Sequence, residues 1–309
     1  VSSLTTAQVV ALTTDQMAAL TTAQLAAFTT AQLVKMETDD VAAITTDQIT
    51  ALKATQVAAL TTAQVVALTT GQVSTLTTAQ LTALTTAQVA KMETDDVAAI
   101  TDTQITALKA TQIAAMTSAQ VVALSTTQLA ALTTAQVVAL TTDNLAAITT
   151  DQISGITTAQ IAAMSNSQVA ALTTAQVVTL STDQLASLTT AQVSKLVTDD
   201  IAAITTDQIT ALTTAQMAVL TTAQVVALST GQIVSLTTDQ LAALKTVQLA
   251  AMETADFAAI TTAQISALTT VQVAALSTDL VVALTTDQMA ALTASQLAAF
   301  TTTRVAKIE

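Results

Sequence analysis

Apolar and polar residues recur along this chain with a fixed period of eight, first seen in residues 4–11 as Leu-Thr-Thr-Ala-Gln-Val-Val-Ala. The period continues without insertion or deletion from Leu4 to Lys307, so these 304 residues hold 304/8 = 38 octads. We number the octad positions one to eight. Large apolar residues occupy positions one and six, Thr or Ser usually occupies position two, and Gln usually occupies position five. Such a period predicts one uninterrupted repeat array over residues 1–309.

Each octad carries the signals that begin a helix. Thr at position two and Gln three residues later form a capping box, in which each side chain accepts a hydrogen bond from the other residue's backbone N–H. The large apolar residues at positions one and six then form the hydrophobic staple that fixes the direction in which the chain enters the helix. Acidic residues at position four, such as Asp15 and Asp47, are favoured by the helix N-terminus.

The predicted helix must also end within its octad, because the next N-cap follows eight residues later. One continuous helix is excluded, since eight residues advance it by about 800° and the apolar positions would spiral around it. We therefore predict an all-α solenoid of short capped helices, one per octad. A β-solenoid is the alternative, because Thr, Val and Ile favour strands. It would need turn residues, and the chain has three Gly and no Pro. The number of octads per superhelical turn and its handedness do not follow from the sequence.

A second, longer period is marked by octads that lack Gln at position five. These exceptions are Asp40, Asp96, Asn144, Asp200, Asp256, Leu280 and Arg304. The first five lie in octads that open larger blocks, and residues 308–309 resemble the opening of another, so that successive blocks begin 56, 48, 56, 56 and 56 residues apart. Duplication of a seven-octad unit explains this spacing. Alternatively, seven octads make a structural unit, such as a whole number of superhelical turns.

Composition excludes several kinds of chemistry. The chain has no Cys and no His, which removes disulfides, thiolate metal sites and the commonest general base. Nearly every polar residue has many equivalents, whereas a catalytic site needs one distinct constellation. We therefore expect no enzyme, no catalytic residue and no cofactor. A net charge of −13 argues against nucleic-acid binding, and polar residues interrupt every apolar run before it could span a membrane.

Clustered acidic residues are the most distinctive local feature. They are Glu37, Asp39 and Asp40; Glu93, Asp95 and Asp96; and Asp199 and Asp200. Hard cations such as Ca²⁺ bind clustered carboxylates, but neither an EF-hand loop nor a Gly-rich calcium repeat is present. The other interpretation is that these acids lie at helix N-termini, with Lys35 and Lys91 as nearby partners. The position-five Gln also leaves two alternatives open, because it could form ladders between stacked turns as well as capping boxes.

Two resemblances concern function. Residues 132–139, Leu-Thr-Thr-Ala-Gln-Val-Val-Ala, resemble the opening helix of TAL-effector DNA-binding repeats, L-T-P-x-Q-V-V-A. Nothing here corresponds to the base-reading loop or second helix of those repeats, so the likeness indicates shared helix-start chemistry. The whole array resembles the Thr/Ala/Gln-rich octapeptide regions of very large secreted bacterial surface proteins, of the adhesin or RTX-like kind. The array begins and ends within an octad, which predicts a fragment of a longer one.

This second resemblance implies an extracellular or cell-surface location and a structural role, as a rigid spacer, stalk or filament element. An interaction scaffold, binding other surface proteins or further copies of itself, is the first alternative. Cation-dependent adhesion through the acidic octads is the second.

Overall fold

The computed structural model describes residues 3–300, which form 37 short α-helices and contain no strand. The predictions made for Val1, Arg304, Lys307 and residues 308–309 lie outside the described residues. The chain divides into two compact units on either side of the bond between Ile156 and Thr157. Each unit is described by itself below.

The first unit contains helices α1 to α19. Their bounds are α1 (Thr6–Val10), α2 (Thr14–Ala19), α3 (Thr22–Ala26), α4 (Thr30–Leu33), α5 (Thr38–Ala43), α6 (Thr46–Ala51), α7 (Ala54–Ala59), α8 (Thr62–Val66), α9 (Thr70–Thr75), α10 (Thr78–Ala83), α11 (Thr86–Val89), α12 (Thr94–Ala98), α13 (Asp102–Ala107), α14 (Ala110–Ala114), α15 (Ser118–Ala123), α16 (Thr126–Ala131), α17 (Thr134–Ala139), α18 (Thr142–Ala147) and α19 (Thr150–Gly155).

The second unit contains helices α20 to α37. Their bounds are α20 (Thr158–Ala163), α21 (Asn166–Ala170), α22 (Thr174–Thr179), α23 (Thr182–Ser187), α24 (Thr190–Val193), α25 (Thr198–Ala203), α26 (Thr206–Ala211), α27 (Thr214–Met217), α28 (Thr222–Val226), α29 (Thr230–Ser235), α30 (Thr238–Ala243), α31 (Thr246–Ala250), α32 (Thr254–Ala259), α33 (Thr262–Ala267), α34 (Thr270–Ala275), α35 (Thr278–Val282), α36 (Thr286–Ala291) and α37 (Ala294–Ala298).

Every helix begins at position three of its octad, directly after the residue predicted to be its N-cap. In α6 the hydroxyl of Thr45 accepts a hydrogen bond from the backbone N–H of Gln48, and the Gln48 side chain accepts one from the Thr45 N–H. The helix ends at position eight, after six residues. The predicted all-α solenoid of short capped helices is confirmed, and its helices are too short to persist alone in water.

The corner between consecutive helices is made by two extended residues. After α6 the chain runs through Leu52 with φ −66° and ψ 142°, and then through Lys53 with φ −69° and ψ 150°. Both conformations are open to any L-residue. No described residue has a positive φ, so these corners need neither Gly nor Pro. This explains how an α-helical array can turn so often with so few turn-forming residues.

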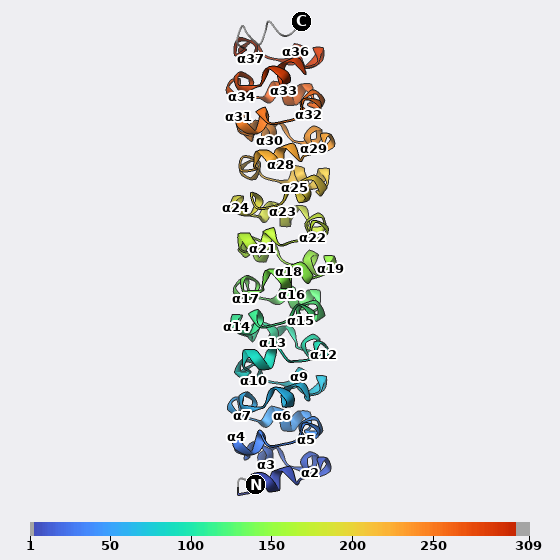
Figure 1. Ribbon diagram of the computed structural model, residues 1–309, viewed down its shortest axis with the longest axis vertical. Helices are drawn as coiled ribbons and strands as arrows, with labels where there is room; N and C mark the ends of the chain where they lie inside the picture. Colours follow the sequence, from blue (N-terminus) through green and yellow to red (C-terminus); the bar gives the residue numbers. More distant parts are fainter. Residues whose placement is uncertain (1–2, 301–309) are drawn as a thin grey trace. The chain divides into compact units, whose positions relative to one another are not determined.

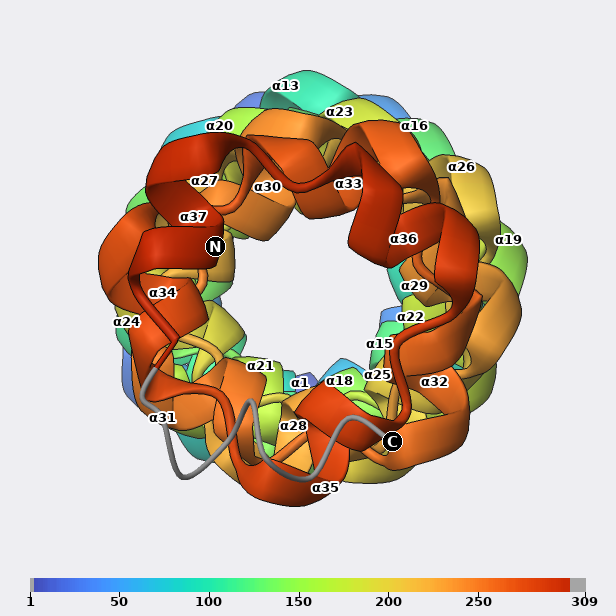
Figure 2. The same cartoon turned by 90° about the horizontal axis from the view of Figure 1, so that it is seen from above.

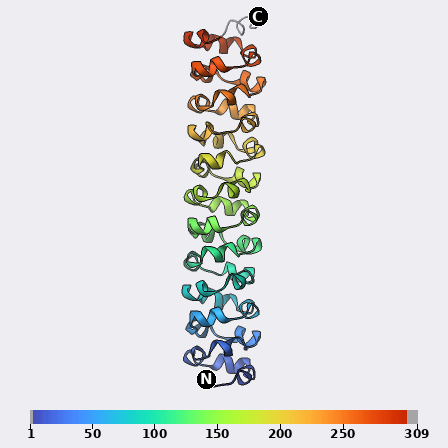
Figure 3. The same cartoon turned by 60° about the vertical axis from the view of Figure 1, so that its left-hand side comes forward.

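Within each unit the helices wind into stacked turns. Figures 1 and 3 show this stacking, and in Figure 1 α4, α7 and α10 lie one above another at one side of the first unit, where each contacts the next. Side chains hydrogen-bond to backbone carbonyls 28 residues earlier, as in the pair formed by Gln80 and Leu52. A turn of about 28 residues contains 28/8 = 3.5 octads.

Seven octads therefore make two turns, and 2 × 28 residues equals the commonest spacing of 56 between blocks. Figure 2 shows the same relation in the second unit, where α28 and α35, seven octads apart, lie at the same side of the ring of helices. This observation favours the structural interpretation of the block. The one block of 48 residues departs from it.

The core of each unit is a thin layer between turns. Positions one and six supply its apolar side chains, such as Leu76 and Val73 at 2% and 0% exposure. Position five is buried as well, although it is polar, and positions two to four face solvent through most of the array. Most of these side chains are aliphatic, and Phe28 and Phe257 are buried in the same layer.

Candidate functional site: the buried glutamine position

The position-five glutamine joins one turn of the array to the turn before it. In the octad of Gln80, the side-chain Oε1 accepts a hydrogen bond of 2.8 Å from the backbone N–H of Thr77, which completes the capping box. The Nε2 of the same amide donates to the carbonyl oxygens of Ile49 (2.8 Å) and Leu52 (2.7 Å). One buried amide thus caps its own helix and binds the C-terminal end of a helix in the preceding turn.

The same pairing recurs through both units. In the first, Gln120 donates to the carbonyls of Val89 and Met92, both at 2.8 Å. In the second, Gln232 donates to the carbonyls 31 and 28 residues before it, at 2.8 and 2.7 Å. The capping box and a hydrogen bond to the preceding turn are therefore both present, made by the Oε1 and Nε2 atoms of one side-chain amide, and the inter-turn bond runs to backbone carbonyls.

Glutamine suits this position for a chemical reason. The carbonyl of Ile49 in α6 already accepts from the Leu52 N–H and has a second lone pair free, whereas the carbonyl of Leu52 in the corner accepts no backbone hydrogen bond from a described residue. The capping N–H needs an acceptor, while these carbonyls need a donor. An uncharged amide supplies both, whereas a carboxylate supplies only acceptors and an ammonium group only donors.

Three of the capping boxes are incomplete because Lys replaces the N-cap Thr. At Lys53, Lys109 and Lys245 the backbone N–H still donates to the Oε1 of the following Gln. The hydroxyl that would accept from the N3 backbone N–H is missing. The contact between turns is kept, since Gln112 still donates to the carbonyl of Leu84 at 2.8 Å.

Two exceptions at position five show what a changed side chain retains. Asn144 is one methylene shorter, yet its Nδ2 reaches the carbonyl of Met116, 28 residues earlier, at 3.1 Å. Its Oδ1 accepts from the Thr141 hydroxyl instead of from the Thr141 backbone N–H. Leu280 supplies neither group and is simply buried. The array therefore keeps its fold where single octads lose part of this pattern.

Four exceptions bury a carboxyl group at position five, and each finds a different set of partners. Asp200 accepts from the Thr174 hydroxyl at 2.8 Å and from the Val197 backbone N–H at 3.2 Å. Asp256 accepts from the Thr230 hydroxyl at 2.5 Å. Asp40 and Asp96 are likewise buried, and the Oδ2 atom of Asp96 has no hydrogen-bond partner. Burial at this position was not apparent from the sequence, which indicated only acids at a helix N-terminus.

Burial changes the acidity of these carboxyl groups. Burial, together with repulsion from the negative charges of Glu93 and Asp95, raises the pKa of Asp96 to about 6. It also raises the pKa of Asp40, with added repulsion from Glu37 and Asp39. At Asp200 burial again raises the pKa, but hydrogen bonds from Thr174 and Val197 oppose it.

The remaining predicted acids lie outside the core. Glu37 and Glu93 are the N-cap residues of α5 and α12, and Asp39, Asp95 and Asp199 are exposed in first helical turns. Lys35 and Lys91 form no ion pair with them in the described part of the chain, so the expected partnership is absent. Residues 3–300 also contain no group of three or more acidic side chains arranged to hold a metal ion.

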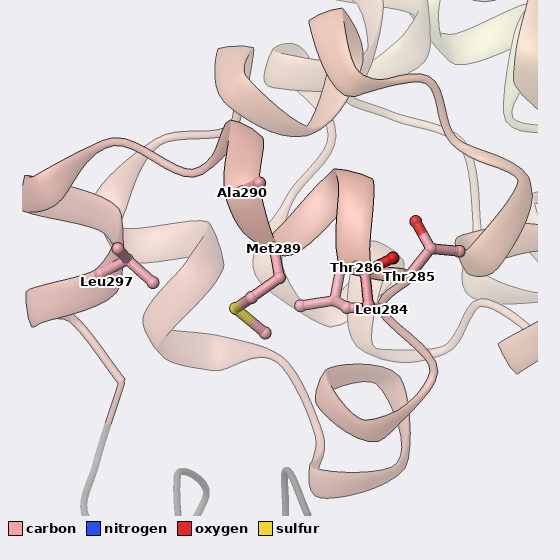
Figure 4. A pocket seen from close by; sticks show the side chains of 6 residues that line it. All are labelled: Leu284, Thr285, Thr286, Met289, Ala290 and Leu297. Atoms are coloured by element: carbon pink, nitrogen blue, oxygen red, sulfur yellow. The ribbon is translucent and has the colours of Figure 1, made fainter.

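An open apolar pocket lies in the last described octads of the second unit (Figure 4). Leu284, Met289 and Leu297 supply most of its lining. Its lining contains no ionisable group.

The fold and this recurring amide define an α-solenoid in which identical inter-turn contacts take the place of one distinct site. The comparisons place the chain more narrowly. The family described as the ALTTAQ repeat matches it in fourteen overlapping segments, which are residues 1–22, 19–54, 33–70, 41–78, 57–92, 89–126, 120–150, 137–174, 145–182, 166–198, 193–230, 211–246, 222–254 and 249–286. The chain belongs to the ALTTAQ repeat family.

No curated protein matches the chain. Among the residues that the structure describes, no helix has both the length and the apolar character required to cross a bilayer.

Proposed function

We propose that this chain is a structural element, a rigid spacer or stalk, and not an enzyme. The observation that carries this proposal is the repetition of one inter-turn contact, in which the position-five amide binds both its own helix and the preceding turn. Almost every octad therefore has its own hydrogen bonds to the preceding turn, and these bonds oppose bending. Solenoids of this kind gain stability from each neighbouring pair of repeats, so their length can increase while their local structure stays the same.

The setting we propose is a large bacterial protein at the cell surface or outside the cell. Support comes from the resemblance of the octads to Thr/Ala/Gln-rich regions of such proteins. The acidic, cysteine-free composition suits a spacer, because it favours solubility and does not depend on the redox state of its surroundings.

The alternative role, a scaffold that binds other proteins along its length, has weaker support. It would need a continuous apolar patch on the surface. The exposed valines at position seven include Val122 and Val138, which are 38% and 47% exposed. These two lie 16 residues apart in the sequence, more than half of a 28-residue turn, so they face different sides of the first unit.

The spacer proposal is tested by changing the length of the array. We would insert one and then two further copies of residues 36–91 after residue 91 and measure the maximum dimension of each chain by small-angle X-ray scattering. A rigid spacer gains the same length with each copy. A maximum dimension that rises with about the square root of chain length, as for a flexible linker, would contradict the proposal.

A further inference from the structure

Asp96 is the buried carboxyl group whose hydrogen bonding the fold leaves incomplete. Its side chain is 2% exposed, and its Oδ2 atom has no hydrogen-bond partner among the described residues. It occupies position five, where Gln80 and others donate to the carbonyl 28 residues earlier. For Asp96 that carbonyl belongs to Leu68, and it accepts no hydrogen bond from a described residue. Two oxygen atoms of buried residues therefore lack a donor at this one contact between turns.

Another exception at position five shows that a side chain of this length reaches that carbonyl when it can donate. Asn144 has the same number of side-chain heavy atoms as an aspartate, and its Nδ2 donates to the carbonyl of Met116, 28 residues earlier, at 3.1 Å. A protonated carboxyl group has an O–H donor where the amide has an N–H, whereas a carboxylate has only acceptors. Protonated Asp96 can therefore donate to the Leu68 carbonyl as Asn144 donates to that of Met116.

Two further exceptions show where a carboxyl group that accepts hydrogen bonds finds its donor. Asp200 accepts from the Thr174 hydroxyl at 2.8 Å, and Asp256 accepts at 2.5 Å from the threonine that likewise lies 26 residues before it. The residue 26 positions before Asp96 is Thr70, at the same position of its octad. Thr70 is exposed, and its hydroxyl makes no hydrogen bond to a described residue. The donor that a carboxylate would use is thus also present.

We propose that Asp96 is a proton-operated contact between α12 and the turn before it. With a proton bound, its Oδ2–H donates to the Leu68 carbonyl, in the arrangement of Asn144. When the proton leaves to solvent, the carboxylate turns to accept a hydrogen bond from the Thr70 hydroxyl, in the arrangement of Asp200. The two forms bind different atoms of the preceding turn, so the pH selects which hydrogen bond joins the turns. The inference concerns this one contact and does not rest on the spacer role.

The charges near Asp96 oppose its ionisation. Burial and the negative charges of Glu93 and Asp95 raise the pKa of Asp96 to about 6. The helices α9 and α15, which pack against α12, carry no titratable side chain. Lys91, which precedes α12, forms no ion pair with a described residue. We therefore expect the change of partner well above the pH at which an ordinary carboxyl group ionises.

Carbon NMR of the 309-residue chain, labelled at the aspartate Cγ and leucine carbonyl carbons, follows both sides of this contact. The Asp96 signal is the one lost in Asp96→Asn. The Leu68 carbonyl signal is the one lost in Leu68→Ile, since Ile occupies the same octad position at Ile100. We expect both signals to change at one shared midpoint near pH 6. In Asp96→Asn the Leu68 carbonyl signal should lose its pH dependence, because the amide donates at every pH.

Thr70→Val removes the hydroxyl that the ionised form uses and leaves the partner of the protonated form in place. The midpoint pH of the Asp96 signal should therefore rise by about 1, which is a ~10-fold weaker release of the proton. Thr78→Val is the matched control and should leave the midpoint unchanged. Thr78 is likewise the exposed first residue of its helix, but the residue 26 positions after it is Gln104. Far-UV circular dichroism verifies that each variant is folded.

Either of two results would overturn the proposal. One is a Leu68 carbonyl signal that stays constant while Asp96 titrates, since the protonated side chain would then not donate to it. The other is a midpoint in Thr70→Val that is no higher than in Thr78→Val, since the carboxylate would then not depend on the Thr70 hydroxyl.

Discussion

At the scale of single residues, the array depends on buried glutamine amides whose oxygen and nitrogen both have hydrogen-bond partners. Gln80 is 1% exposed, and a buried polar group without partners costs roughly 1–3 kcal/mol. The side chain meets this demand by accepting at Oε1 and donating at Nε2. The same geometry makes position five sensitive to the loss of its donor, which leads to the first prediction.

Gln80→Glu should destabilise its part of the array by roughly 2–4 kcal/mol, because a buried carboxylate then faces the carbonyls of Ile49 and Leu52. Gln16→Glu is the matched control. It keeps the same capping bond, but at an exposed site where its Nε2 donates to no described residue, and should change stability by less than about 0.5 kcal/mol. Native-state hydrogen exchange measures both effects locally. Equal costs at the two sites would show that only the capping bond matters.

A second prediction concerns Asp96, whose raised pKa links local stability to pH. The ordinary value is 3.8 and the folded value is about 6, so the folded state holds the proton more tightly. Stability from this group is therefore fully present below pH 3.8 and is lost as pH rises through about 6. The carboxylates that act on it are Glu93 and Asp95; α9 and α15, which contact its helix α12, carry no titratable residue.

Hydrogen exchange of residues 94–98 should accordingly show less protection at pH 8 than at pH 5, after correction for the intrinsic rate. Asp96→Asn should remove this difference and be the more stable form at pH 8, by on the order of 1–3 kcal/mol. Asn144 shows that this shorter amide reaches the preceding turn. Asp95→Asn, at an exposed site, is the control and should leave most of the pH dependence in place. A pH effect that persists in Asp96→Asn would assign it to another group.

At the scale of the helix, the octad contains nearly everything needed to predict its own structure. The capping box and the periodic apolar positions located every helix start, because they depend on residues at most five apart in the chain. The extended corner through Leu52 and Lys53 was harder to foresee. The corner requires no special residue type. The only sequence signal for it is therefore the next N-cap residue.

The corner geometry gives a prediction about proline. Thr62 is the first residue of α8, where a backbone N–H has no intrahelical partner, and Thr61 before it has the φ of −70° and ψ of 160° that proline favours in its predecessor. Thr62→Pro should therefore raise stability by about 0.4–1 kcal/mol. Ala67→Pro, in the same octad, removes the hydrogen bond to the Ala63 carbonyl and should cost roughly 3 kcal/mol. Thermal unfolding of the two variants should shift in opposite directions, and a destabilised Thr62→Pro would contradict the assigned helix start.

At the scale of the whole molecule, the sequence left the number of octads per turn open. That number depends on which carbonyls the Gln amide reaches, and these lie 28 to 31 residues away. The burial of Asp96 was hidden for the same reason, since the turns that cover it are distant in sequence. Local patterns predict a capped helix well, but they do not fix how helices stack when every octad resembles the next.

Deletions should show whether the array keeps its fold when a whole octad is removed and loses part of it when half an octad is removed. Removing residues 84–91 deletes one whole octad, and every later octad still meets a neighbour of the same pattern. We expect helicity per residue to be kept and the melting temperature to change by only a few degrees. Removing residues 84–87 alone leaves half an octad, which misplaces position five against the preceding turn. Hydrogen exchange should then show lost protection over about one turn of 28 residues; unchanged protection would mean that the contacts between turns are not specific.

The hydrogen bonds between turns have a mechanical consequence within each unit. Gln80, in the middle of α10, donates to the carbonyl of Ile49 in α6 and to that of Leu52 in the corner after it, so a helix of the next turn bridges this corner. Where position five is Gln, each corner in one turn is bridged in this way by a helix of the next turn. Bending must therefore deform helices and their capping bonds, so we infer that stiffness is distributed evenly and that no octad serves as a hinge.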